Sequence, residues 1–70
     1  MYNKQMEKYI IKYRYPYEWD ISPRPMYETT SYGVSIQDVK ERFIVKYPYA
    51  KPILITFYSS MAKRYISYKC

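Results

Sequence analysis

The sequence predicts a small α+β domain of two layers, in which one helix packs on an antiparallel sheet and the elements follow the order ββαββ. Three observations predict it. Segments rich in Tyr, Ile and Thr alternate with period 2, one stretch has helical periodicity between capping and stop signals, and prolines separate the segments. The 70 residues suffice for a single domain, 1–70, because a chain this short builds only one core.

The first half of the chain predicts two strands joined by a loop. Residues 1–6 form a polar lead-in that we expect to be frayed. Residues 8–15 alternate between two faces and are typical of a strand. The three prolines within residues 16–25 block ladder hydrogen bonds and predict a stiff extended loop. The Tyr- and Thr-rich residues 26–32 then predict a second strand.

Residues 36–46 carry the signals of a helix. Ser35 is a candidate N-cap, and Asp38 stands three residues later in a short-armed variant of the capping box. Pro48 stops the helix. The apolar stripe that we expect to face the sheet consists of Ile36, Val39 and Phe43.

The end of the chain predicts a hairpin. Residues 53–58 and 63–69 alternate like strands, and the short connection between them favours a hairpin turn. The sheet residues that we expect beneath the helix are Ile11 (or Ile10, if the strand has the opposite parity), Ile53, Ile55, Phe57 and Ile66.

Positive charge is concentrated in the second half of the chain. The net charge is +6, and residues 36–70 contain seven basic and two acidic side chains, with no acid after Glu41. A clustered positive surface attracts polyanions. The same net charge would also serve merely to keep a small protein in solution.

Twelve tyrosines, several of them interleaved with basic residues, favour nucleic acid as the polyanion. Tyrosine rings stack on unpaired bases, and lysine and arginine bind phosphates. We therefore expect a small basic, Tyr-rich binding protein that binds nucleic acid non-specifically through the C-terminal hairpin and the sheet face. The candidate phosphate-binding residues are Lys12, Arg14, Lys46, Lys63, Arg64 and Lys69. The candidate base- or sugar-binding residues are Tyr13, Tyr15, Tyr65 and Tyr68.

Tyrosine suits two other roles as well. Strands favour it, so about half of the rings should serve as core or rim packing, and tyrosine is enriched at protein interfaces. The alternative is a viral or plasmid accessory module that binds a host protein or forms a homodimer and has no nucleic-acid role. We expect a homodimer because exposed sheet edges need protection. Basic residues on the first and last strands should block edge pairing, which favours a face-to-face contact.

We expect no enzymatic activity, no catalytic residue, and no cofactor or metal site. The chain has no His, and its single Cys70 cannot form an internal disulfide or a Cys-based zinc finger. Gly33 is the only glycine, too few for a phosphate-binding loop. The carboxylate pairs Glu18/Asp20 and Asp38/Glu41 fit a loop and a helix N-terminus better than a catalytic site.

No apolar run exceeds three residues, so the sequence predicts neither a membrane-spanning segment nor a secretory signal. The expected location is therefore the cytoplasm, which would be that of the host cell for a viral protein.

Overall fold

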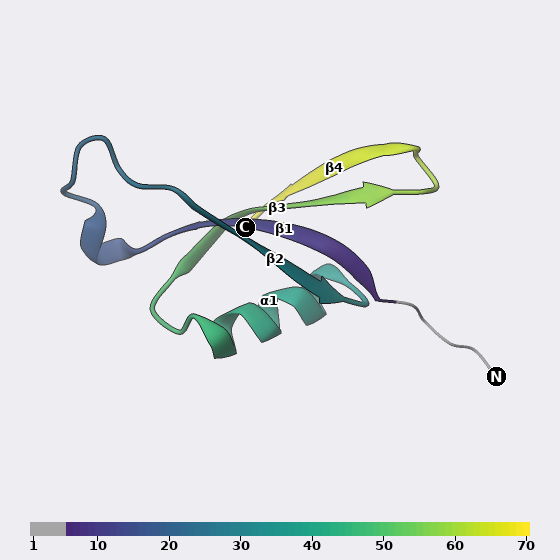
Figure 1. Ribbon diagram of the computed structural model, residues 1–70, viewed down its shortest axis with the longest axis horizontal. Coiled ribbons are helices and arrows are strands. Elements are labelled where there is room, and N and C mark those ends of the chain that lie inside the picture. Colours follow the sequence, from purple (N-terminus) through teal and green to yellow (C-terminus); the bar gives the residue numbers. More distant parts are fainter. Residues whose placement is uncertain (1–5) are drawn as a thin grey trace.

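The computed structural model describes residues 6–70, which form four strands and one α-helix (Figure 1). The expected frayed lead-in, residues 1–6, lies outside the described residues except for Met6. Each of the four expected strands and the expected α-helix begins and ends within two residues of its expected position, since alternation, caps and prolines are local signals. In chain order the elements are β1 (Glu7–Arg14), a 3-10 helix (Pro16–Glu18), β2 (Tyr27–Gly33), α1 (Ile36–Lys46), β3 (Lys51–Ser59) and β4 (Arg64–Lys69).

The strands form one antiparallel sheet in the order β2-β1-β3-β4. β1 therefore lies inside the sheet and pairs with both β2 and β3, and the edges are β2 and β4. The expectation that basic residues on the first strand protect an edge is wrong, because β1 is not an edge. The actual second edge, β2, contains no Lys, Arg or Pro.

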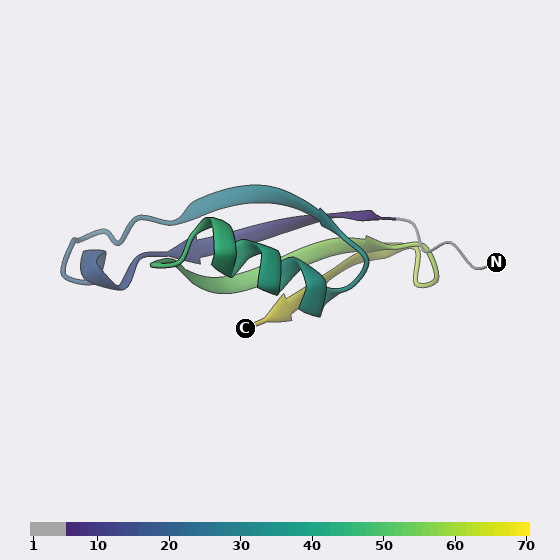
Figure 2. The same ribbon diagram turned by 90° about the horizontal axis from the view of Figure 1, so that it is seen from below.

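The predicted two-layer architecture, with a helix layer covering the sheet, is wrong. The described residues are largely sheet, and the molecule measures 49 × 25 × 15 Å. α1 has 11 residues, which makes it about 16 Å long. The helix is closest to β2 and does not cover the whole sheet. It lies near β2, and the free end of the β3–β4 hairpin extends beyond it (Figures 1 and 2).

The buried residues form one cluster contributed by β1, β3 and α1. Val39 and Phe43 of the expected apolar stripe are buried, and Ile36 is partly buried. Two tyrosines of β1, Tyr9 and Tyr13, are also buried, although Tyr13 was expected in the binding site. The complete cluster is Tyr9, Ile11, Tyr13, Val39, Phe43 and Ile55.

Two residues expected in the core lie outside it. The register between β1 and β3 shifts after Lys12, so that Tyr13 pairs with Pro52 and Ile53 is left as the extra residue of a bulge. Ile53 is consequently only half-buried. Ile66 lies on the edge strand β4, where it pairs with Phe57 of β3, and it is also half-buried. Phe57 itself packs against the cluster while remaining partly exposed.

A tight connection sets α1 beside β2. The Asp38 N–H donates to the Ser35 Oγ (3.1 Å), as the N-cap signal predicts. The Asp38 Oδ2 accepts from the Val34 N–H (3.0 Å), one residue before the Ser35 N–H that a capping box would use. A Cβ atom on Gly33 would lie 2.6 Å from the Val39 Cγ2. Only a glycine therefore allows the end of β2 to approach the first turn of the helix this closely.

None of the helices in the described part of the chain has the length and apolarity needed to span a membrane.

Candidate nucleic-acid interface

The two faces of the sheet differ because successive residues of a strand point to opposite sides. On β1, Tyr9, Ile11 and Tyr13 point to the side of the helix and are buried. The residues between them, and their partners across the sheet, form the opposite surface, which we call the open face. Its members are Lys8, Ile10, Lys12, Glu28, Thr30, Tyr32, Leu54, Thr56, Tyr58, Tyr65, Ser67 and Lys69.

Three tyrosines are exposed on the open face. Tyr32 on β2 is 57% exposed, Tyr58 on β3 is 50% exposed and Tyr65 on β4 is 68% exposed. Tyr58 and Tyr65 are cross-strand partners, and their rings meet edge to face with centroids 5.3 Å apart. Aromatic rings are thus presented from three of the four strands.

Lysines stand among these rings. Lys8 is the cross-strand partner of Tyr32. Tyr9 and Phe57 pair across β1 and β3 and point toward the helix. Their neighbours Lys8 and Tyr58 therefore both point to the open face. Farther along, Lys12 pairs with Leu54, and Leu54 pairs with Lys69. Glu28, the partner of Lys12, is the only acid of the face. Lys8, Lys12 and Lys69 are all exposed.

A tryptophan lies beyond one end of the open face. The Lys51 Nζ is 5.6 Å from the centre of the Trp19 ring, and the Arg24 guanidinium carbon is 5.9 Å from it. The Arg24 Nε also donates to the Trp19 carbonyl at 2.9 Å. Arg14, the partner of Lys51, has a buried Nε that meets no hydrogen-bond acceptor among the described residues. These contacts hold the proline-rich segment against the sheet, and the segment includes a 3-10 turn where an extended loop was expected.

The structure brings only part of the expected site together. Lys12, Lys69 and Tyr65 lie on the open face. Arg64 and Tyr68 alternate with Tyr65 and therefore point to the other side, where the Lys40 Nζ lies 5.7 Å from the Tyr68 ring. The two tyrosines of β4 thus cannot contact the same ligand.

The other expected residues are spread over the molecule. Lys63 lies in the β3–β4 turn with φ of 55°, and Lys46 lies at the end of α1. Arg14 belongs to the Trp19 end of the sheet. Tyr15 caps the 3-10 helix and packs against Tyr17 and Tyr27.

Tyr13 is a core residue with an exposure of 7%. Its ring centroid lies 5.1 Å from that of Phe43 and 5.2 Å from that of Tyr47. Burial above all, and then the neighbouring Tyr47 and Tyr15, raise the pKa of Tyr13. A ring enclosed in this way cannot stack on a base.

Sequence reasoning missed Lys8, Tyr32 and Tyr58. The alternation within each strand could have found two of them. Lys8 is an even number of residues from Lys12 and so lies on the same face of β1. Tyr58 is likewise on the same face of β3 as Thr56 and Leu54. Joining residues of different strands into one face requires the strand order, which the sequence did not supply.

Glu18 and Asp38, one from each of the carboxylate pairs considered above, have hydrogen-bond partners. The Tyr27 hydroxyl donates to the Glu18 Oε2 at 3.0 Å, a contact that raises the pKa of Tyr27. The Asp38 carboxylate accepts from the Val34 N–H and from the Arg42 Nε (3.1 Å). Among residues 6–70, no group of three or more Cys, Asp or Glu side chains is placed to hold a metal ion.

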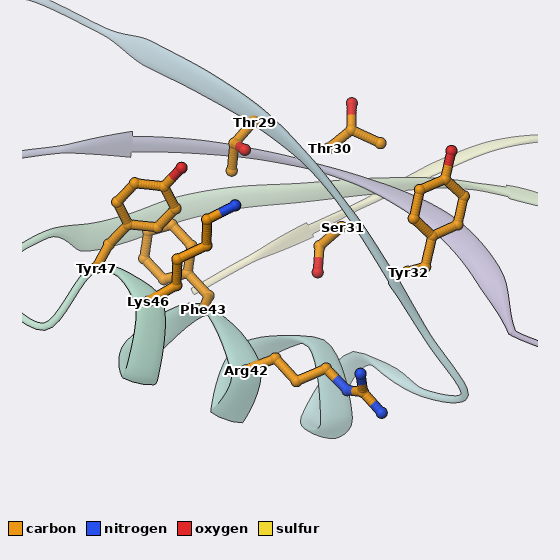
Figure 3. A pocket seen from close by; sticks show the side chains of 8 residues that line it. All are labelled: Thr29, Thr30, Ser31, Tyr32, Arg42, Phe43, Lys46 and Tyr47. Atoms are coloured by element: carbon orange, nitrogen blue, oxygen red, sulfur yellow. The ribbon is translucent and has the colours of Figure 1, made fainter.

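A separate groove of about 340 Å³ runs between β2 and α1 (Figure 3). Residues 29–32 form its β2 side. Arg42, Phe43, Lys46 and Tyr47 form its helix side. Lys46, which was expected in the nucleic-acid site, belongs to this groove and not to the open face.

Comparison of the chain with protein-family models, with curated proteins and with solved structures gives no match in any of the three.

Proposed function

We propose that this protein binds single-stranded nucleic acid, without sequence specificity, through the open face of its sheet. The observation that supports the proposal best is the presence of three exposed tyrosines and three exposed lysines on one face. Tyrosine rings offer stacking surfaces that accept any base, and lysines between them neutralise the phosphates. The helix lies on the other side, so the open face is free for a ligand.

A single strand suits this surface better than a duplex. The bases of a duplex are read through its grooves by an inserted helix or β-ribbon. The open face is a sheet surface whose rings would meet bases by their faces, which requires unpaired bases. Tyr32 lies on one edge strand and Tyr65 on the other. A single strand of nucleic acid that contacts both would cross the sheet strands.

The three lysines set the expected salt dependence. Neutralising about three phosphates of a single strand gives a slope of log K against log salt of about −2. The affinity should fall in the non-specific range, with a Kd of about 10⁻⁴ to 10⁻⁶ M at physiological salt.

The test is a fluorescence anisotropy titration of a labelled 20-nucleotide oligothymidine, with a duplex of the same length for comparison. Tyr58→Ala and Tyr65→Ala should each weaken binding by about 1–3 kcal/mol. Tyr68→Ala is the matched control, because Tyr68 is on the same strand as Tyr65 but points to the opposite side. Equal losses from Tyr65→Ala and Tyr68→Ala would contradict the assignment to the open face, and no binding at low salt would refute the function.

The same exposed rings favour one alternative, a face-to-face homodimer or a contact with another protein. Such an interface would be much less sensitive to salt than phosphate binding. Sedimentation of the wild type and of Tyr58→Ala separates the two. A dimer that dissociates in the variant, together with a flat salt response, would favour the protein interface. A cytoplasmic location belongs to the same proposal, since single-stranded RNA is present there.

A further inference from the structure

The groove between β2 and α1 adjoins an unprotected sheet edge. β2 pairs with β1 on one side only, so every second residue directs its N–H and C=O away from the sheet. Edges of this kind are usually blocked by lysine, arginine or proline. The other edge, β4, carries Arg64 and Lys69, whereas β2 carries none of these residue types.

Two cations lie on the helix side of the groove. Arg42 and Lys46 are separated by one helical turn, and both line the groove across from β2 (Figure 3). The Arg42 Nε donates to the Asp38 Oδ1 at 3.1 Å, so Arg42 is ion-paired, whereas Lys46 has no ion-pair partner among residues 6–70. None of the eight lining residues is acidic. The groove is therefore positive along its helix side.

The two cations lie beside the edge that an added strand would occupy. The chain reverses direction between β2 and α1, and Figure 1 shows the helix inclined to β2. The spacing of Arg42 and Lys46 along the helix therefore sets no register for an added strand. Both residues line the groove beside β2, so acidic side chains of an added strand would lie near them.

We propose that the edge of β2 binds an extended acidic peptide as a fifth strand, with acidic side chains of the peptide near Arg42 and Lys46. The backbone pairing supplies the attachment, and the two cations select the acidic sequence. This inference does not depend on the nucleic-acid proposal, because it rests on the free edge of β2 and on the cations of α1. The two surfaces meet at β2, where Thr30 and Tyr32 belong to the open face and also line the groove.

A second copy of the chain fits the groove less well. Pairing β2 with β2 of another copy would bring two sets of Arg42 and Lys46 to the same place, in chains that each carry a net charge of +6. The β2 side chains that face the helix include Thr29 and Ser31 and no acid, since Glu28 points to the open face. Charge complementarity favours an acidic partner strand.

The first test uses a fluorescein-labelled peptide of eight residues that alternates Val and Glu, titrated with the full chain at low salt. Lys46→Gln should weaken binding by about three- to fivefold, the upper range for an exposed ion pair. Lys12→Gln is the matched control, because Lys12 lies on the open face. A peptide with Lys in place of Glu should not bind. Equal effects of Lys46→Gln and Lys12→Gln would overturn the proposal.

The second test addresses the backbone and needs no variant of the protein. Two versions of the peptide are N-methylated at alternate residues, one at the Val positions and one at the Glu positions. In one version the methyl groups replace the N–H hydrogens that face β2, and this version should not bind. In the other version they replace the hydrogens that face away from β2, and this version should bind. Equal affinity of the two would refute strand pairing.

Competition and sedimentation complete the design. Oligothymidine should not displace the peptide from the Tyr32→Ala protein, in which the shared tyrosine is shortened. Displacement from this variant would place both ligands at one site and overturn the groove site while leaving nucleic-acid binding intact. A β2-mediated dimer that does not bind the peptide would instead identify a second copy as the occupant, and would also refute the proposal.

Discussion

The change Gly33→Ala tests how closely β2 approaches the helix. Gly33 is buried at the end of β2, and a Cβ atom there would lie 2.6 Å from the Val39 Cγ2 and 2.7 Å from the Asp38 Oδ2. Carbon atoms normally pack about 3.5–4.0 Å apart, so the new methyl group overlaps the valine by about 1 Å. Val39 is fully buried, and a β-branched residue in a helix has one strongly preferred rotamer. It cannot turn away.

Two effects of opposite sign decide the magnitude. Replacing glycine restricts the unfolded chain and by itself stabilises a protein by about 0.4–1 kcal/mol. Overpacking a well-filled core costs about 1–3 kcal/mol. Moving Asp38 aside would also break its hydrogen bond to the Val34 N–H, a loss of about 1 kcal/mol. The clash outweighs the gain, and Gly33→Ala should lower the free energy of unfolding by about 1–3 kcal/mol.

Urea denaturation followed by circular dichroism measures this directly, and Val39→Ala supplies the internal control. That change removes the Cγ2 atom that the new methyl group would meet. The double variant should therefore be at least about 1 kcal/mol more stable than the sum of the two single losses predicts, as expected for residues in contact. Additive losses, or a Gly33→Ala protein as stable as the wild type, would refute the close approach and the position of α1 beside β2.

Three further predictions concern stability. Phe43→Ala should lower the free energy of unfolding by about 3–5 kcal/mol because the ring is 3% exposed, and urea denaturation that shows under 1 kcal/mol would contradict its place in the core. Lys63→Gly should stabilise the protein by up to about 1 kcal/mol in the same assay, since φ of 55° is unfavourable for a residue with a side chain, while Lys63→Ala should give no such gain. The Val34 N–H, and then Arg42, lower the pKa of Asp38. Its stabilising effect is therefore complete above the ordinary pKa of about 3.9 and is lost as pH falls through the folded-state value. Below pH 4 the wild type should lose stability more steeply than Asp38→Asn, with the exposed Asp20→Asn as the control.

The elements were predictable because their signals are local. A cap at Ser35, a stop at Pro48 and an apolar stripe between them define α1 without reference to the rest of the chain. Alternation does the same for each strand. The buried Ile11, Val39, Phe43 and Ile55 follow from these patterns.

The architecture and the site were less predictable because they depend on relations between elements. Alternation shows that Tyr13 and Lys12 face opposite ways, but it does not show which of them meets the helix. Tyrosine suits a core and a binding surface equally, so Tyr13 was placed in the site although it is buried. The length of the helix was predicted correctly, but its position was not, because α1 lies close to β2 and the free end of the β3–β4 hairpin extends beyond it.

The core and the proposed binding surface arise from the same alternation in β1. Tyr9, Ile11 and Tyr13 are buried on one side, while Lys8, Ile10 and Lys12 lie on the other. A shift of this strand by one residue would exchange the two sets and place lysines in the core. Burial of the aromatic and aliphatic set therefore holds the lysines on the open face. The open face needs no packing of its own to fix its register, and its tyrosines and lysines remain available for a ligand.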